Sequence, residues 1–523
     1  MAKKEEHKPL SFSTTMRNPE RIAAFLSCLK EFEKMILTND LIDKIVKKII
    51  KNKLYEPYYI SRNKNLKEIS KSEETYTENQ LEDIISNSPQ KHKEAGFDKG
   101  WPSRFDTWYK ISKEFGFLYY EMNKNIEISE TGHMLCEAYE NINDNLTNEK
   151  IQNIFLNALT KYQTNNPFRK NANKNAPIML LLNLLKLLKK DSEENGAGLH
   201  RKELSFIICW PNNNYIDLYK FIKNFRKIYK FSASDEIIYK TCLTLLNSEN
   251  EKRFKMKQIV KEATDDLIRK LRITGIFSLR GMGRFIDLNT FQIEKIDYII
   301  SKYTDYKTFN NELEYFEYMG HIDSQIINLI SNIPVSTVEK IKVDALKKFS
   351  SEYSIQTISN ELDILSSKKP SKDLFLADID QPTRLEFLTS LILVKIFPNA
   401  FVKPNYSIDD EGIPTFTARG GVADIEFYDN NIDSLIEVTM MQNRSQASTE
   451  IPPITRHLKE FKNNSKKQIV FSLFIAPSIH EDTNYMCDFS KMRDKVDIIP
   501  ISIKDFILRI STVKSISDFI IHK

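Results

Sequence analysis

Apolar and polar residues alternate along the segment 419–439, RGGVADIEFYDNNIDSLIEVT. Alternation with a period of two is typical of β-strands, and the dipeptide Asn430-Asn431 between the two alternating runs is typical of a tight turn. The segment is therefore predicted to form a β-hairpin that turns at these two asparagines. In that register Asp424 lies directly opposite Glu437, and the alternate positions form a mostly apolar face.

The charges of this hairpin indicate a metal site. Two carboxylates that face each other across a hairpin repel, and a divalent cation between them removes the repulsion. Hard cations such as Mg²⁺ prefer oxygen ligands. Asp424 and Glu437 are therefore predicted to form half of a magnesium site. The simpler alternative is that both carboxylates face solvent on an exposed hairpin.

The pattern around the hairpin predicts an α/β domain. A helix over 382–397 carries Glu386, and a short strand over 401–408 follows it. After the hairpin come a helix over 453–463, the continuous apolar run 468–476, which is typical of a buried strand, and one more strand. The order is αβββαβ with a further strand. With an Asp and a Glu on a hairpin, this order is the pattern of the PD-(D/E)xK nuclease superfamily.

The lysine of that superfamily is missing, because the motif reads Glu437-Val438-Thr439. A threonine cannot position or activate a water molecule as a cationic amine can. The candidates to replace the lysine are Gln442, Arg444, Glu450 and His457. A histidine has a pKa suited to proton transfer, although a position on the helix surface is the simpler interpretation of His457.

Residues 1–300 have a different pattern. Helical segments are followed twice by a strand–turn–strand pattern, over 115–129 and over 274–288. This succession is typical of winged helices, some of which bind DNA and some of which bind other proteins. Residues 1–300 are therefore predicted to hold winged-helix-like subdomains, and residues 301–380 a helical linker domain.

Several residues of this first region are candidates for contacts with DNA. They lie beside a predicted helix start or in a glycine-rich turn, and they are Arg17, Arg21, Lys99, Trp101, Ser103, Arg104, Arg280 and Arg284. Arginine can bind guanine in the major groove through two hydrogen bonds, and hydroxyl or helix N–H groups can hold phosphates. For any one of these residues, a solvated surface position is the simpler explanation.

Composition adds little to this picture. A chain of 523 residues is long enough for several domains, and a net charge of +5 permits nucleic-acid binding without requiring it. The five cysteines show no CxxC spacing, which argues against zinc and fits a reducing compartment. No apolar run is long enough to cross a bilayer. A bacterial cytoplasmic protein without a membrane partner is expected.

Both ends of the chain resemble a known family. The N-terminal segment KPLSFSTTMRNPERI and the C-terminal segments EVT, PPITRHLKEF, FSLFIAP and IIPISIKDF resemble the AlwI family of type IIS restriction endonucleases and the related nicking endonucleases. The resemblance implies a catalytic centre made of a helix Glu, an Asp, the Glu of EVT, a later Glu and the histidine of TRH. These are Glu386, Asp424, Glu437, Glu450 and His457. The first three would hold Mg²⁺.

The chain is therefore predicted to be a modular endonuclease of multidomain α+β fold. Residues 1–300 would recognise a short asymmetric sequence in double-stranded DNA, and residues 381–523 would hydrolyse phosphodiester bonds at a fixed distance from it, with Mg²⁺. One centre cuts one strand, so a monomer that dimerises transiently on DNA is expected. Two alternatives stay open: a strand-specific nicking endonuclease, and a DNA-binding regulator with winged helices that has lost catalysis.

Overall fold

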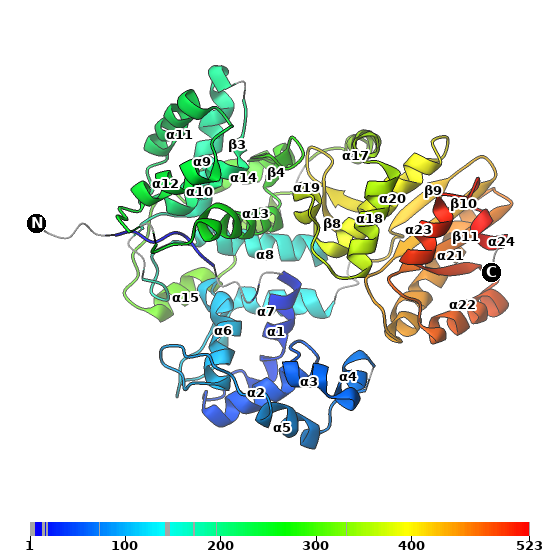
Figure 1. Cartoon of the computed structure of the whole chain (residues 1–523), viewed down its shortest axis with the longest axis horizontal. Helices are drawn as coiled ribbons and strands as arrows, with labels where there is room; N and C mark the ends of the chain where they lie inside the picture. Colours follow the sequence, from blue (N-terminus) through cyan, green and yellow to red (C-terminus); the bar gives the residue numbers. More distant parts are fainter. Residues whose placement is uncertain are drawn as a thin grey trace, which may run out of the picture. The chain divides into compact units, whose positions relative to one another are not determined.

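The computed structural model describes residues 6–12, 16, 19–72, 74–141, 147–170, 173–194, 196–250, 252–330 and 332–521. The chain folds into two compact units (Figure 1). The first comprises Met1–Lys67, Thr75–Ile142 and Thr147–Asn332, and the second comprises Glu68–Glu74, Asn143–Leu146 and Ile333–Lys523. The first is mostly helical, and the second holds a five-stranded mixed sheet with helices. The predicted multidomain α+β class is thus confirmed.

The N-terminal part of the chain is helical. Its helices are α1 (Pro19–Ser27), α2 (Asn39–Lys51), α3 (Tyr58–Arg62), α4 (Lys64–Lys71), α5 (Glu78–Ser86) and α6 (Trp101–Glu114). Apolar residues recur every three or four positions along α2, so the helix buries Leu41, Ile45 and Ile49 on one face. The hydroxyl of Thr38 caps this helix by accepting a hydrogen bond from the Leu41 amide at 3.2 Å.

A short antiparallel hairpin follows α6. It consists of β1 (Leu118–Tyr119) and β2 (Glu127–Ile128), and it leads into α7 (Glu130–Glu140). Gly116 begins the hairpin with a φ of +73°, and a Cβ at this position would lie 2.2 Å from the Cβ of Met319. Only glycine satisfies both conditions. The succession of helix, hairpin and helix that the sequence predicts over 115–129 is present.

The rest of the first unit adds helices and a small sheet. The helices are α8 (Thr147–Lys161), α9 (Pro177–Lys190), α10 (Leu204–Cys209), α11 (Tyr215–Tyr229), α12 (Asp235–Leu245), α13 (Ala263–Ile273), α14 (Ile293–Lys302), α15 (Glu312–Gly320) and α16 (Ser324–Asn328). The antiparallel sheet has the order β3 (Leu199–His200), β5 (Phe285–Leu288), β4 (Phe277–Arg280). The predicted strand–glycine turn–strand pattern over 274–288 forms β4 and β5, and β3 is a third strand that the pattern did not predict.

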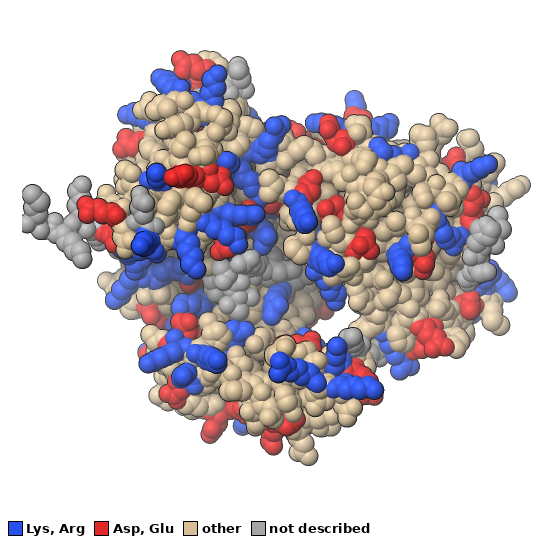
Figure 2. All heavy atoms as spheres, viewed as in Figure 1, with Lys and Arg blue, Asp and Glu red and all other residues tan. Residues whose placement is uncertain are grey.

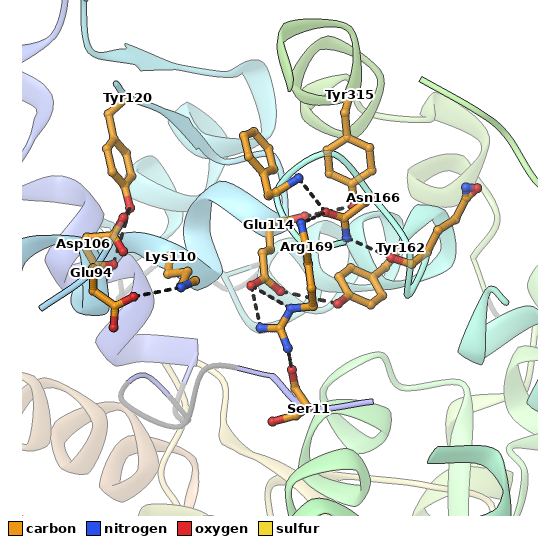
Figure 3. A network of polar contacts seen from close by, with 12 residues as sticks. Ser11, Glu94, Asp106, Lys110, Glu114, Tyr120, Tyr162, Asn166, Arg169 and Tyr315 are labelled. Carbon is orange, nitrogen blue, oxygen red and sulfur yellow. Dashed lines mark hydrogen bonds and ion pairs between the residues drawn. The ribbon is translucent and has the colours of Figure 1, made fainter. Parts of the chain in front are cut away.

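A buried polar network fixes the C-terminal end of α6 (Figure 3). Glu114 is fully buried, and its Oε1 accepts hydrogen bonds from Arg169 Nη2 at 2.7 Å and Nε at 3.2 Å. The same guanidinium donates to the carbonyl of Ser11, and the hydroxyl of Tyr315 donates to the Glu114 carbonyl at 3.2 Å. Burial raises the pKa of Glu114, and the charge of Arg169 opposes that rise. A buried carboxylate needs such a partner, so the network holds α6 firmly in the first unit.

The second unit is built around a five-stranded sheet. Its strand order is β12 (Ile498–Ser502), β11 (Ile469–Ala476), β10 (Ile432–Val438), β9 (Ile425–Tyr428), β6 (Phe401–Pro404). The strands β10, β11 and β12 are parallel, whereas β9 is antiparallel to both of its neighbours. β11 has a strand on each side and buries Phe471, Leu473 and Ile475, as the continuous apolar run predicts.

The helices of the second unit precede, connect and follow these strands. They are α17 (Val335–Glu352), α18 (Ile355–Ser366), α19 (Leu374–Ala377), α20 (Gln381–Ile396), α21 (Ile451–Asn464), α22 (Glu481–Asp494), α23 (Ile503–Ile510) and α24 (Asp518–Ile521). A separate antiparallel pair, β7 (Tyr406–Ile408) and β8 (Pro414–Ala418), lies in the chain between β6 and β9. No helix among the described residues is long and apolar enough to cross a membrane.

The β9–β10 hairpin has the predicted register. Ile425 pairs with Ile436 and Phe427 with Ser434, and the Asp429 amide donates to the Ile432 carbonyl at 2.8 Å across the asparagine turn. The side chains of Ile425, Phe427 and Ile436 are fully buried. The alternating apolar positions therefore face the core, which directs the intervening positions to the other face of the hairpin.

Two parts of this unit differ from the sequence prediction. The strand expected over 401–408 is divided into β6 and β7, because Asn405 turns aside and its side-chain amide donates to the carbonyl of Ala423 at 2.8 Å. The helix α22 was not predicted. Its buried residues are the small or polar Thr483, Cys487 and Ser490, so it lacks the apolar stripe that identifies a surface helix.

Candidate active site

The five residues that the resemblance assigns to a catalytic centre all belong to the second unit. Glu386 lies on α20, Asp424 directly precedes β9, and Glu437 lies near the end of β10. Glu450 ends a π-helical turn that leads into α21, and His457 lies on α21 itself. The hairpin, this π-helical turn and two helices therefore carry the whole candidate set.

Asp424 and Glu437 face each other across the hairpin. The amide of Val438 donates to Asp424 Oδ2 at 2.7 Å, and the amide of Asp424 donates to Glu437 Oε2 at 3.3 Å. Burial raises the pKa of Asp424 well above its usual range, and the negative charge of Glu437 raises it further. Backbone hydrogen bonds thus hold two repelling carboxylates close together.

The remaining oxygen of Glu437 points toward His457. Its Oε1 lies 3.6 Å from His457 Nδ1, which is beyond hydrogen-bond distance. Both atoms are buried, and neither has a hydrogen-bond partner among the described residues. Buried polar atoms without a partner are uncommon in proteins. A carboxylate oxygen and an imidazole nitrogen are thus both free to bind a ligand at this point.

Glu386 brings a third carboxylate toward the hairpin. Its side chain is 2% exposed and accepts hydrogen bonds from the Ala418 amide, at 3.0 Å to Oε2 and 3.3 Å to Oε1. Burial raises the pKa of Glu386 well above its usual range. The negative charge of Asp424 raises this pKa further, and that of Glu437 does so more weakly. The three carboxylates therefore interact electrostatically.

Thr439, which stands where the superfamily has a lysine, contacts the fourth carboxylate. Its hydroxyl donates to Glu450 Oε1 at 3.1 Å. Burial raises the pKa of Glu450, and this hydrogen bond opposes the rise. The threonine therefore orients Glu450 without adding a positive charge to the site.

The donor set fits a hard divalent cation, although the side chains do not already enclose one. Among the described residues, no group of three or more His, Cys, Asp or Glu side chains is arranged to hold a metal ion. Burial raises the pKa values of Glu386, Asp424 and Glu450, which disfavours their charged forms in the absence of a cation. Together with the unpartnered oxygen of Glu437 beside His457, these groups nevertheless supply carboxylate oxygens. Mg²⁺ prefers such ligands, and its charge would relieve their repulsion.

Two other candidates for the missing lysine lie apart from these carboxylates. Arg444 is exposed and forms an ion pair with Asp482 at the start of α22. Gln442 is partly buried, and its backbone carbonyl accepts a hydrogen bond from Ser478 at 3.5 Å. Of the four candidates, Glu450 and His457 are therefore the two with contacts to the hairpin residues.

One charged residue near the site was not predicted. Lys342 lies on α17 and is 5% exposed, and its charge acts on the pKa of Glu386. A signal was present in the sequence, because Lys342 precedes Ala345, Leu346 and Phe349 at the spacing of one helix face. A lysine on an apolar face marks a buried charge.

In the first unit, two of the predicted DNA-binding residues lie close together near the start of α6. Arg104 Nη2 donates to the Tyr55 hydroxyl at 3.1 Å, and its Nη1 lies 2.6 Å from His92 Nε2. Arg21 on α1 donates to the carbonyl of Leu54 at 3.2 Å. Partial desolvation lowers the pKa of Arg21, and the positive charge of Arg104 lowers it further. Two arginines from separate helices are therefore near enough to repel each other.

The other candidates around α6 have different surroundings. The indole N–H of Trp101 donates to a backbone carbonyl of α5 at 3.4 Å, and Lys99 is exposed. Ser103 is fully buried. Its hydroxyl donates to the Asp98 carbonyl at 2.8 Å and accepts from the Glu94 amide at 2.9 Å, so it is used within the loop that precedes α6.

The last two candidates flank the turn between β4 and β5. Arg280 Nε donates to Asp287 Oδ2 at 2.7 Å, so its charge is paired within the sheet. Arg284 is exposed and donates to the Gly281 carbonyl at 2.9 Å. Arg17 lies outside the described residues. The structure thus groups Arg21 and Arg104 near the start of α6, whereas Arg280 and Arg284 lie at a separate turn.

Surface charge alone does not identify a DNA-binding face. Figure 2 shows Lys and Arg side chains spread over the visible face of both units and interspersed with Asp and Glu. This distribution agrees with the small net charge of +5. The local arrangement of the arginines is therefore more informative than the overall charge.

Several solved structures are similar to this chain, among them the following three. The small subunit (R.BspD6I2) of the heterodimeric restriction endonuclease R.BspD6I is 25% identical over 29% of this chain and 76% of that chain, with a TM-score of 0.25. Restriction endonuclease FokI is 12% identical over 99% of this chain and 98% of its own, with a TM-score of 0.25. FokI bound to DNA is 12% identical over 98% and 97%, with a TM-score of 0.24. At these TM-scores the similarities carry no argument about the site.

The family comparison is stronger. No match was found among curated proteins. The family model of the AlwI restriction endonuclease matches residues 113–369 and 321–508. Because these two segments together span 113–508, which is most of the 523 residues, the chain belongs to the AlwI restriction endonuclease family and is a site-specific deoxyribonuclease.

Proposed function

We propose that the chain is a type IIS restriction endonuclease. It recognises a short asymmetric sequence in double-stranded DNA through residues 1–300 and cleaves outside that sequence with residues 381–523. The observation that carries this proposal is the pair Asp424 and Glu437, held together across a hairpin with an unpartnered Glu437 oxygen beside His457. The order α20, β6, β9, β10, α21, β11 around this pair supports a PD-(D/E)xK core.

In the proposed mechanism, Asp424, Glu437 and Glu386 would hold Mg²⁺. When bound, this ion supplies a Lewis acid for the scissile phosphate and lowers the pKa of a water molecule. His457 Nδ1 is buried, has no partner among the described residues and lies beside Glu437, so it can accept a proton from the attacking water. Glu450 is the alternative base, and Thr439 orients it.

Recognition is proposed to begin near the start of α6. The guanidinium of Arg104 stacks 4.9 Å from the centre of the Tyr55 ring, and that of Arg21 lies 5.4 Å from the centre of the Phe25 ring. Aromatic support restricts the motion of an arginine and prepares it for a planar hydrogen-bonding partner. Their mutual repulsion decreases when an anion binds between them. The hairpins β1–β2 and β4–β5 would serve as the wings of two winged-helix subdomains.

The double substitution Arg21→Gln and Arg104→Gln is expected to weaken sequence-specific binding by at least about thirtyfold, because each of the two base contacts would contribute about 1–3 kcal/mol. Gel shifts at fixed salt concentration would measure the loss. Arg62→Gln is a matched control, since Arg62 also stacks on an aromatic ring, that of Tyr58, at 4.4 Å. Unchanged binding by the double variant would exclude this surface from recognition.

Cleavage of both strands is proposed to require a second copy of the chain. The second unit contains one candidate centre, and one centre attacks one strand. On α22, Tyr485, Phe489 and Met492 are 64%, 49% and 75% exposed and lie along one side of the helix. The exposed Glu481 and Arg493 lie at opposite ends of this apolar stripe. Two copies related by a two-fold axis would therefore pair acid with base across apolar residues.

The proposed function is tested by cleavage of a plasmid library with mapping of the product ends. Cuts at a constant distance to one side of one short sequence, present with Mg²⁺ and absent with EDTA, are the expected result. Cuts inside a palindromic sequence would contradict the asymmetric site. Nicks in one strand only would favour the nicking endonuclease, and binding without cleavage would favour the regulator.

A further inference from the structure

Lys342 occupies a position where helix α17 should carry an apolar residue. The helix buries Ala345, Leu346 and Phe349, and Lys342 lies on the same face, one turn earlier. With 5% of its surface exposed, its side chain is as buried as theirs. Removing an ammonium from water costs free energy unless other groups compensate for it. Its surroundings therefore decide what this charge does.

The ammonium of Lys342 lies among charged and aromatic groups. Its Nζ is 3.4 Å from Glu339 Oε1 on the same helix and 5.8 Å from the centre of the Tyr406 ring. Burial lowers the pKa of Lys342, whereas Glu339 and, more weakly, Glu386 raise it. The contact with Glu339 is long, and Glu339 is itself partly exposed, so this pair compensates the buried charge incompletely.

The β7–β8 pair connects Lys342 with the candidate active site. Tyr406, over whose ring the ammonium lies, pairs with Ala418 across the two strands. The amide of Ala418 in turn donates to the carboxylate of Glu386 at 3.0 Å. Glu386 and Lys342 therefore approach the same strand pair from two helices, α20 and α17.

The position of α17 against this strand pair is fixed by close packing. Gly412, in the turn between β7 and β8, has a φ of +75°, and a Cβ there would lie 2.3 Å from the Cβ of Ala345. Further along the helix, Lys395 Nζ on α20 donates to the carbonyl of Ser350 at 2.6 Å. The turn thus meets α17 within one helical turn of Lys342, so the ammonium cannot move away without disturbing the core.

We propose that Lys342 is a positioning residue of the active site and supplies the positive charge that the Glu437-Val438-Thr439 motif lacks. The inference rests on the proposed function and adds a residue from outside 381–523 to it. Without metal and DNA, the ammonium balances part of the charge of Glu386 and its neighbouring carboxylates. With DNA bound, it favours the negative charge that the phosphate brings.

This role predicts opposite changes in two measurements. Replacing Lys342 by methionine removes a cation that competes with the metal ion, so DNA-free protein should bind Mn²⁺ about tenfold more tightly. The same change removes a charge that stabilises the phosphate, so the rate of DNA cleavage should fall by roughly tenfold to a hundredfold. A lysine with a merely structural role would not tighten metal binding.

The experiment uses the full-length protein with the variants Lys342→Met and Lys342→Arg, and with Lys340→Met as a control on the exposed side of the same helix. Calorimetric titration with Mn²⁺ measures the first effect, and single-turnover cleavage with Mg²⁺ measures the second. The arginine variant keeps the charge but is larger, so it is expected to lie closer to the wild type than the methionine variant does in both measurements. If the methionine variant does not fold, Lys342→Gln replaces it.

The outcomes separate this inference from the function on which it rests. The role of Lys342 is supported if the methionine variant binds Mn²⁺ more tightly and cleaves DNA more slowly, while Lys342→Arg and Lys340→Met change little. If the wild type binds Mn²⁺ and cleaves DNA and the methionine variant behaves identically, the role of Lys342 is overturned. The proposed function then stays intact. A wild type that neither binds Mn²⁺ nor cleaves DNA overturns both.

Discussion

Asp424→Asn and Glu437→Gln are each expected to reduce the rate of DNA cleavage by about a thousandfold, while sequence-specific binding stays unchanged. The expected size reflects the loss of a charged ligand at a centre that acts by electrostatic stabilisation. Both replacements keep the shape of the side chain and an oxygen that can accept the backbone hydrogen bonds from Val438 and Asp424. Single-turnover cleavage and gel shifts on the same protein samples would measure the two properties.

Glu426→Gln is the matched control for this pair. Glu426 lies on β9, the strand that Asp424 directly precedes. Unlike Asp424, it has a carboxylate that pairs with Lys403 at 2.9 Å and accepts a hydrogen bond from Asn405 at 3.0 Å. Its replacement should alter cleavage by less than about threefold, because removing a partly exposed ion pair has a small effect. Cleavage by both Asp424→Asn and Glu437→Gln at the rate of the control would rule out the proposed centre.

The stability of Asp424→Asn relative to the wild type should depend on pH in a defined direction. The pKa of Asp424 is raised in the folded protein by burial and by Glu437, so ionising it favours the unfolded chain. This destabilisation is absent at a pH below the pKa of Asp424 in the unfolded chain. It is complete once the pH exceeds the raised pKa of Asp424 in the folded protein. In EDTA, Asp424→Asn should therefore melt at a higher temperature than the wild type, and the difference should grow as the pH rises.

Phe489→Asp combined with Met492→Glu is expected to abolish double-strand cleavage and to leave nicking of one strand. The substitutions place negative charges on the exposed stripe of α22, where two copies would otherwise bury apolar side chains. Supercoiled plasmid should then accumulate as nicked circles without linear product. The wild type should form linear product more steeply than linearly with enzyme concentration, and it should sediment as a monomer without DNA.

Two further variants separate this interface from a general loss of solubility or folding. Leu508→Asp changes another exposed apolar residue, on α23, and should keep double-strand cleavage. Glu481→Arg should weaken double-strand cleavage, and the addition of Arg493→Glu should restore it. The reason is that two antiparallel copies of α22 would bring these two positions together. Persistence of linear product in the α22 double variant would exclude this helix from the contact.

The sequence predicted the parts of the second unit that follow a simple period. The alternation around Asn430-Asn431 fixed the register that brings Asp424 opposite Glu437, since a slip by one residue would have exposed Ile425 and Phe427. The apolar run of β11 likewise has one stable place, in the sheet interior. These predictions succeeded because burial of one face depends only on residues close together in the sequence.

The features that the sequence did not predict depend on contacts between distant segments. In helix α22 the large apolar residues Tyr485, Phe489 and Met492 are exposed, whereas small or polar residues face the core. A helix on the surface of a protein usually shows the opposite arrangement. Lys342 approaches Glu386 only because α17 and α20 meet at one strand pair. The surroundings of Ser103 depend on the fold of the loop before α6. The periodicity of α17 indicates that Lys342 is buried, but no period along the chain shows its approach to Glu386, the outward face of α22 or the contacts of Ser103.

Thr439 has a consequence for the way in which the proposed centre depends on a bound ion. Because its hydroxyl is neutral and donates to Glu450, the proposed centre keeps four carboxylates with no positively charged residue in the Glu437-Val438-Thr439 motif. Before an ion binds, the ionised carboxylates of such a centre would repel the phosphate backbone, and Lys342, in its proposed role, would offset only part of this repulsion. Within this motif, a bound ion would therefore be the source of positive charge at the moment of cleavage.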